Sequence, residues 1–224
     1  AEIARRRRAG MLGIGAAVLV VVQGVLGGLT VIWQLPPEVS TAHLGVSMLF
    51  FALLVLICFR TGDTRPQVVL PPRTRTLVGA ALVAIYAQIV VGAWVRHRGA
   101  GLACADLPLC GGALWPDADP ARLHMLHRIG AILSGVMLVA AALGVRACAQ
   151  GGLLRRLGWI LPVLVVSQIA LGALAVIRGL DLFLITAHLG VGALLWAGAV
   201  ALWLGSRAAP VRVADPIAAA EAAQ

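Results

Sequence analysis

Three histidines occupy matching positions near the start of long apolar segments, namely His43, His127 and His188. A fourth, His124, precedes His127 by three residues, so both lie on one face of a helix. An ionisable residue within such an apolar segment usually has a function, because its burial in lipid costs free energy. Neutral imidazole is the commonest metal ligand in proteins, and histidines from facing helices of a bundle can hold haem iron. These residues therefore indicate metal-ligand chemistry, with haem as the favoured group.

The alternatives are a zinc site and a structural role. Zinc would require cysteine or carboxylate ligands at the same depth, and the apolar segments offer none. A single histidine would more often be a hydrogen-bonded packing residue, but three at one depth favour ligands. Haem propionates would need cations at the nearby membrane boundary, and Arg96, Arg98 and Arg128 are candidates. Arginine side chains that extend to the interface would explain the same three residues.

Glycines and glutamines accompany the histidines in a repeated pattern. A glycine near each histidine leaves room for a flat macrocycle, at Gly45, Gly130 and Gly190. In the segment before each histidine, a glutamine is followed four residues later by a glycine, so the two share a helix face. These pairs are Gln23 with Gly27, Gln88 with Gly92, and Gln168 with Gly172. We interpret them as packing contacts with one interhelical hydrogen bond each, in preference to a role in a haem pocket.

An internal repeat connects two of the histidines. Residues 23–49 and 168–194 align without a gap, with 14 of 27 positions identical, and both contain Thr-Ala-His-Leu-Gly-Val. Self-similarity of this kind marks a repeated supersecondary unit, here two apolar segments joined by a short turn. A third pair of segments, with a longer connection at 96–122, contains His127. We therefore expect three helical hairpins.

The composition indicates that these hairpins cross a membrane. Of the 224 residues, 61% are hydrophobic, and the mean hydropathy is +0.97, well above that of a soluble domain. A transmembrane helix needs about 20 predominantly apolar residues. Six segments qualify: about 11–33, 43–59, 76–95, 123–145, 154–177 and 186–205. We predict an all-α fold, a polytopic membrane bundle of six transmembrane helices packed through glycine and alanine.

The arginines predict the orientation of this bundle. All 18 basic residues are arginine, and 13 of them flank the segments on the side that carries both termini. The positive-inside rule places that side in the cytoplasm, so the histidines lie toward the outer side. The net charge of +9 could suggest a nucleic-acid partner. Arginines that flank membrane spans explain the charge, and we expect no nucleic-acid partner.

The four cysteines divide between the two sides. Cys104 and Cys110 lie in the long outer connection, where an oxidising compartment would favour a disulfide. Such a bond would contribute about 2–3 kcal/mol to stability in the chain-entropy model. Two free thiols, a metal site and a redox-active pair are the alternatives. Cys58 and Cys148 lie at the cytoplasmic side and should stay reduced.

Together these motifs resemble the heme A synthase family. The stretch that carries the resemblance is GAWVRHRGAGLACADLPLCGGALWP followed by HMLHRIGA, and its most diagnostic part is Cys-x5-Cys ahead of His-Arg. With the QGVLGG and TAHLGV segments, the resemblance covers residues 8–205. It implies an inner-membrane oxidoreductase that oxidises a methyl group of haem O to the formyl group of haem A for terminal oxidases. It also implies eight helices in two halves related by pseudo-twofold symmetry.

The resemblance further implies roles for particular residues. His127 and His188 would be the axial ligands of a haem b cofactor, and His43 would belong to the site of the substrate haem. Cys104 and Cys110 match the family's cysteine pair. Haem O would be the substrate, and haem O synthase a partner. Glycine-rich helix faces would also permit a homo-oligomer.

The sequence departs from the family pattern at its start. The first hairpin is missing, and with it the histidine that would pair with His43 and a catalytic glutamate three residues before that histidine. The corresponding position before His127 is His124, so no glutamate substitutes there. We therefore expect a part of a longer protein, without an identified catalytic residue. Its expected units are the second hairpin of the N-terminal half (1–60), a cytoplasmic loop (61–75), the C-terminal four-helix haem b half (76–206) and a cytoplasmic tail (207–224).

Two functions without catalysis would use the same ligands. A b-type cytochrome would bind one haem and pass electrons to or from quinol. A haem carrier or assembly module for an oxidase would bind haem without oxidising it. The product separates these functions from the enzyme, because only the enzyme makes a haem that carries a formyl group.

Overall fold

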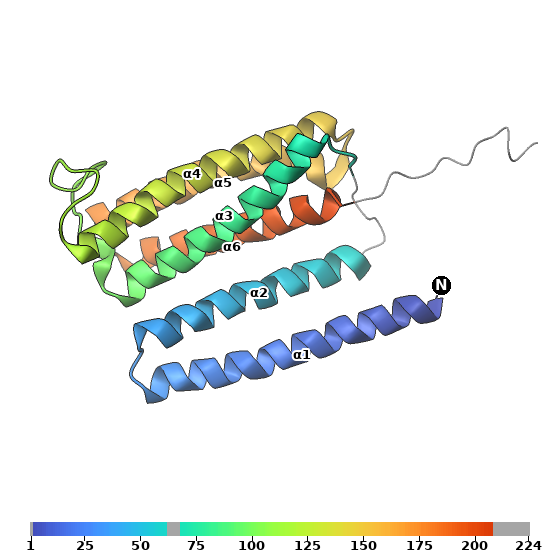
Figure 1. Cartoon of the computed structure of the whole chain (residues 1–224), viewed down its shortest axis with the longest axis horizontal. Coiled ribbons are helices and arrows are strands. Elements are labelled where there is room, and N and C mark those ends of the chain that lie inside the picture. The colour runs from blue at the N-terminus through green and yellow to red at the C-terminus, as the bar shows by residue number, and fades with distance from the viewer. Residues whose placement is uncertain (1, 62–67, 208–224) are drawn as a thin grey trace, which may run out of the picture.

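The structure is a computed structural model that describes residues 2–61 and 68–207, with side chains from Gly10 onward. It consists of long helices joined by short connections and one longer loop (Figure 1). The helices are α1 (Glu2–Ile32), α2 (Pro37–Thr61), α3 (Pro72–His97), α4 (Asp119–Cys148), α5 (Gly152–Ile177) and α6 (Leu182–Gly205), with a short 3-10 helix η1 (Ala100–Leu102). Most of the expected loop, 62–67, and the expected tail, 208–224, lie outside the described residues.

Each of the six long helices is long and apolar enough to cross a membrane. This confirms the all-α fold and the six transmembrane helices that the sequence predicts. The helices extend past the apolar segments at several ends, because helical hydrogen bonding continues into polar residues. Helix α4, for example, begins at Asp119, and Pro120 lies in its first turn, where the missing N–H costs no hydrogen bond.

Helices α3 to α6 form a four-helix bundle. Each packs against the next in chain order, α6 packs back against α3, and α4 also contacts α6 across the bundle. Helix α2 packs against α3 and α6, and α1 lies on the far side of α2 (Figure 1). The molecule is therefore a bundle with one hairpin attached through α2.

A group of deeply buried leucines lies away from the histidines. Leu138, Leu161 and Leu202 are essentially without exposure, and all three lie beyond the histidine level on their helices. Close helix approach there depends on glycine, because a Cβ at Gly198 would lie 2.5 Å from Leu161 Cδ2. These contacts hold the four helices of the bundle together beyond the level of the histidines.

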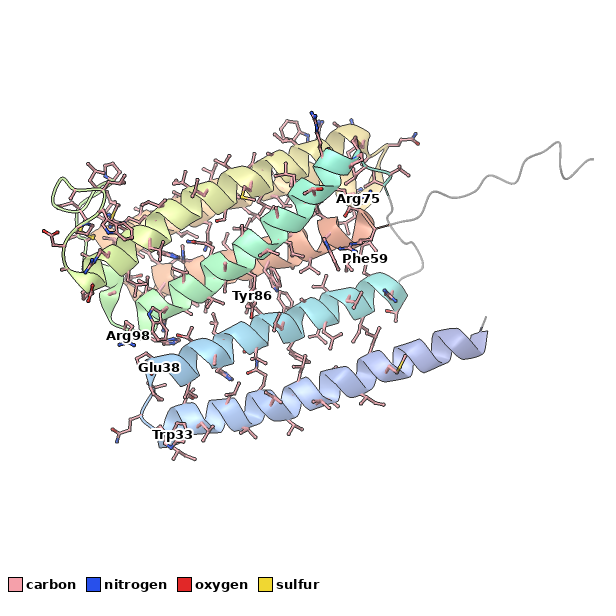
Figure 2. All side chains as sticks on the ribbon, in the orientation of Figure 1. Trp33, Glu38, Phe59, Arg75, Tyr86 and Arg98 are labelled. Atoms are coloured by element: carbon pink, nitrogen blue, oxygen red, sulfur yellow. A yellow bond between two sulfur atoms is a disulfide. The ribbon has the colours of Figure 1, made fainter. Side chains whose placement is uncertain are left out.

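Two aromatic side chains attach the α1–α2 hairpin to the bundle. Tyr86 Oη donates to the backbone oxygen of Gly45 (3.2 Å), and Trp196 Nε1 donates to that of Met48 (2.7 Å). The two rings contact one another with their centroids 5.4 Å apart. Figure 2 shows Tyr86 of α3 directed toward α2. These bonds fix the height of α2, and therefore of His43, relative to the bundle.

Candidate functional site

Each hairpin carries a glutamine and, four residues later, a glycine on its first helix, and a histidine on its second helix. In all three hairpins the histidine ring lies over that glycine. The pairs are His43 over Gly27, His127 over Gly92, and His188 over Gly172. A Cβ added at these glycines would lie 3.3, 2.7 and 3.0 Å, respectively, from Cε1 of the facing imidazole. Only a residue without a side chain leaves room for the ring at these positions. The repeated Gln-x-x-x-Gly pattern thus makes room for a histidine and also packs two helices together.

The glutamines reach the same histidines. Gln23 Nε2 donates to the backbone oxygen of His43 (3.2 Å). Gln88 Nε2 lies 2.8 Å from both the backbone oxygen and the ring Nδ1 of His127. Each glutamine makes the predicted interhelical hydrogen bond, but the sequence did not identify its partner. The three pairs share one spacing, and this shared spacing could have identified the histidines as the partners of the glutamines.

The third pair uses a different arrangement. His188 Nδ1 lies 3.0 Å from the backbone oxygen of Gln168, and its Nε2 lies 3.2 Å from the Gln168 amide nitrogen. A backbone oxygen only accepts hydrogen bonds, so Nδ1 must carry the proton. Nε2 is then unprotonated and accepts a hydrogen bond from the Gln168 amide.

The bundle brings two of the three histidines together. His127 on α4 and His188 on α6 lie on helices that contact one another across the bundle. His43 belongs to the separate α1–α2 hairpin. Its Nδ1 and Gln23 Oε1 are buried, and neither has a hydrogen-bond partner within the described chain. Unpartnered buried polar atoms are uncommon and costly, so this pair is suited to an additional polar group.

The residues around His127 and His188 fit a haem. Both rings lie on glycines, and His188 already has the arrangement of a metal-ligating histidine, with Nδ1–H bound to a backbone oxygen and Nε2 unprotonated. A zinc site needs a fuller ligand set. Among the described residues, no group of three or more histidine, cysteine or carboxylate side chains could hold a metal ion. The donor set therefore fits an iron macrocycle better than a bare ion.

His124 lies one turn before His127 and is only 4% exposed. Its Nδ1 is buried without a partner among the residues described. The sequence predicts that His124 shares a helix face with His127. In the structure it is a further buried polar side chain beside His127.

Arg128 binds the outer loop. Its guanidinium donates to the backbone oxygens of Asp106 (2.7 Å) and Cys104 (2.5 Å), and more weakly to those of Pro108 and Leu109. This loop contains the disulfide between Cys104 and Cys110, which confirms the predicted bond. Arg128 therefore anchors the loop to α4 at the level of the histidines, and its expected contact with a haem propionate stays a prediction.

The other two candidate arginines lie at the outer end of α3. Arg98 pairs with Glu38 of α2 at 3.0 Å and stacks on the ring of Trp94, and Figure 2 shows Arg98 and Glu38 side by side. Arg96 is exposed. Nearby, His97 Nδ1 hydrogen-bonds the hydroxyl of Thr41 (3.2 Å). These contacts join the first hairpin to the bundle, and a propionate role for Arg96 and Arg98 also stays a prediction.

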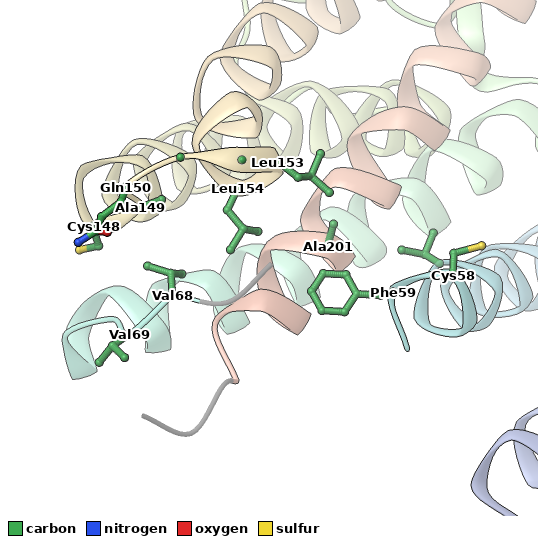
Figure 3. A pocket seen from close by; sticks show the side chains of 13 residues that line it. Cys58, Phe59, Val68, Val69, Cys148, Ala149, Gln150, Leu153, Leu154 and Ala201 are labelled. Carbon is green, nitrogen blue, oxygen red and sulfur yellow. The ribbon is translucent and has the colours of Figure 1, made fainter. Parts of the chain in front are cut away.

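A cavity of about 800 Å³ lies at the opposite end of the helices, between the end of α2 and the α4–α5 turn (Figure 3). Its lining is mainly apolar and includes Cys58 and Cys148, which are free and exposed. No histidine lines it. It is therefore distinct from the histidine site.

Comparison with known proteins gives consistent matches. The model of the COX15-CtaA family, described as cytochrome oxidase assembly protein, matches residues 2–200. Heme A synthase of Symbiobacterium thermophilum is 35% identical over 83% of the chain and 64% of its own length. Those of Halalkalibacterium halodurans and Geobacillus kaustophilus are 29% and 32% identical, over 84% and 91% of the chain. The chain spans 64%, 65% and 68% of the lengths of these three relatives.

Proposed function

The chain belongs to the COX15-CtaA family of cytochrome oxidase assembly proteins, and on that premise we propose that it makes haem A, the activity for which its relatives are named. The proposed reaction oxidises a methyl group of haem O to a formyl group, so the protein would be an oxidoreductase with haem O as substrate. The observation that carries the proposal is the pair His127 and His188, held over glycines inside one four-helix bundle.

In this proposal His127 and His188 would hold haem b. When bound, haem b would supply the redox chemistry of the reaction. The chain contributes the two imidazoles, the glycines that give them room and the glutamines that fix their rings. The tight core beyond them keeps the bundle rigid, which favours a defined ligand geometry.

His43 is proposed to take part in binding the substrate haem. Its ring lies over Gly27 as the other two lie over their glycines, and its Nδ1 is buried without a partner among the described residues. The bonds from Tyr86 and Trp196 hold α2 against the bundle. They keep His43 at a constant position relative to the haem b ligands.

The proposed location is the inner membrane, with both termini in the cytoplasm and the histidines toward the outer side. The distribution of arginines supports this orientation. The disulfide supports it independently, because a stable disulfide is expected on the oxidising side of the membrane.

Haem extraction tests the function. The complete gene product is expressed in a host that supplies haem O, and the haems are extracted and separated. A haem with a formyl group, absent from cells without the protein, is the expected result. Retention of haem b without that product would favour a b-type cytochrome, and transfer of unaltered haem to an oxidase would favour a carrier; either result would contradict the proposal.

Variants test the ligands. His127→Ala and His188→Ala should each lose the low-spin haem b spectrum, because each removes one axial ligand. His97→Gln is the matched control, since His97 lies at the outer end of α3 and bonds Thr41. If either alanine variant keeps a full low-spin spectrum, the ligand assignment is wrong.

A further inference from the structure

The glutamine contacts differ between the two proposed haem ligands. We propose that Gln88 is a positioning residue for His127, whose amide selects the ring nitrogen that carries the proton. His188 then already has the tautomer that iron binding through Nε2 needs, although the Gln168 amide must leave Nε2, and His127 gains that tautomer only when the Gln88 amide turns. This inference rests on the proposed haem site.

The backbone itself prepares His188. Its Nδ1 donates to the backbone oxygen of Gln168 at 3.0 Å, within helix α5, so the proton stays on Nδ1. A neutral imidazole that binds a metal through Nε2 needs this tautomer. Because the acceptor is a backbone oxygen, no substitution of the Gln168 side chain removes it.

His127 has the opposite tautomer. Gln88 Nε2 lies 2.8 Å from the backbone oxygen of His127, and this contact requires the amide nitrogen, since two oxygens would repel one another. The same nitrogen lies 2.8 Å from the ring Nδ1. An amide nitrogen only donates, so Nδ1 accepts and the proton is on Nε2. That tautomer has no lone pair on Nε2 for iron.

Gly130 leaves room for the Gln88 amide in its present position. A Cβ at Gly130 would lie only 2.4 Å from Gln88 Oε1, so the amide occupies the space that a side chain there would need. Gly130 therefore has a more specific role than leaving room for a macrocycle. The first hairpin lacks the ring contact, because Gln23 bonds only the backbone oxygen of His43. Gln168 reaches the ring of His188 at Nε2, so a glutamine side chain contacts the Nδ1 atom only at His127 among the three pairs.

Ligation through Nε2 requires that the proton on Nε2 leave and that Nδ1 gain one, so that the ring stays neutral. Nδ1 then becomes a donor and needs an acceptor. Gln88 supplies it when its side chain rotates away from the backbone oxygen of His127 and turns Oε1, in place of Nε2, toward Nδ1. A better acceptor at this position makes the imidazole more basic, and its loss makes the imidazole less basic. The side chain at position 88 should therefore tune the haem b potential.

Redox titration of the haem-loaded protein tests this tuning. Gln88→Glu should lower the midpoint potential of haem b, because a more basic ligand favours ferric iron. Gln88→Leu should raise the potential and weaken haem retention by about 10- to 100-fold. Gln168→Leu is the matched control and should shift the potential less, because His188 keeps its backbone acceptor. If the Gln88 variants keep the wild-type potential, or if Gln168→Leu shifts it equally, the inference is wrong.

A second measurement does not depend on haem. In protein from a haem-deficient host, ¹⁵N spectra of labelled histidines should show His127 protonated at Nε2 and His188 at Nδ1. Gln88→Leu should abolish the preference of His127, and Gln88→Met serves if the leucine variant does not fold. His127 protonated at Nδ1 in the wild type would overturn the inference. If the wild type from a haem-sufficient host retained no haem, the proposed function would be contradicted, and the spectra of the haem-free protein would still decide on Gln88.

Discussion

At the scale of single residues, the closest contact at the proposed ligands is between Gly92 and the ring of His127. Gly92→Ala would place a Cβ 2.7 Å from Cε1 of that ring, and either the ring or the helix would have to move. Overpacking of this kind typically costs about 1–3 kcal/mol. We expect a lower thermal unfolding temperature in detergent, together with loss of haem from the His127 site.

Gly79 gives a matched control in the same helix. A Cβ at Gly79 meets nothing within 4 Å, and alanine has the higher helix propensity, so Gly79→Ala should be neutral or slightly stabilising. Equal effects of the two substitutions would show that helix α3 tolerates a methyl group at Gly92, and that the ring does not depend on this glycine.

Sequence reasoning found the ligand candidates but not their surroundings. The histidines were detectable because lipid makes an ionisable residue costly, which turns residue type into a signal. The bond from Gln88 to His127, and the room that Gly130 leaves for it, depend on side-chain rotamers and helix rotation. Neither quantity follows from spacing alone. The same holds for Arg128. Its position in the sequence did not show whether it contacts the loop carbonyls or only extends to the membrane interface.

At the scale of elements, the outer loop depends on Arg128. Hydrogen bonds to a charged group contribute about 1.5–3 kcal/mol each when partly buried, and Arg128 makes several to the backbone around the disulfide. Arg128→Gln should therefore raise hydrogen exchange of residues 103–113. Arg122→Gln is the control, because Arg122 makes an exposed ion pair with Asp119 in the first turn of α4, worth little in water. Comparable exchange in both variants would contradict an anchoring role for Arg128.

The helices themselves were predictable because the membrane requires long apolar segments whose backbone hydrogen bonds are internal. The ends of the helices were harder to predict. Helix α4 begins at Asp119 and α1 at Glu2, and a hydropathy profile does not include such polar residues in an apolar segment. The contact of α2 with both α3 and α6 could also not be predicted from the sequence. Hairpin repeats indicate which helices are similar, and they do not indicate which helices contact one another.

At the scale of the whole molecule, Trp196 connects the attached hairpin to the bundle. Trp196→Phe keeps an aromatic ring beside Tyr86 but removes the donor to the Met48 oxygen. A hydrogen bond of this kind contributes about 0.5–1.5 kcal/mol, so the unfolding temperature should fall, and substrate haem bound near His43 should be held less tightly. Trp115→Phe, in the exposed part of the outer loop, should change neither quantity. A Trp196→Phe protein that matches the wild type in both would show that α2 is held by other contacts.

The proposed orientation can be tested with the protein's own cysteines. Cys58 and Cys148 are free and exposed at the end that carries the cavity, and Cys104 and Cys110 form the disulfide at the other end. A membrane-impermeant maleimide added to inside-out vesicles should label the two free thiols. Added to right-side-out vesicles, it should label only after reduction, and then only the loop pair. Cys58→Ser and Cys148→Ser assign the signal to each thiol. Labelling of either free thiol from the outer side would reverse the orientation, and would place the histidines and the proposed haem site at the cytoplasmic side.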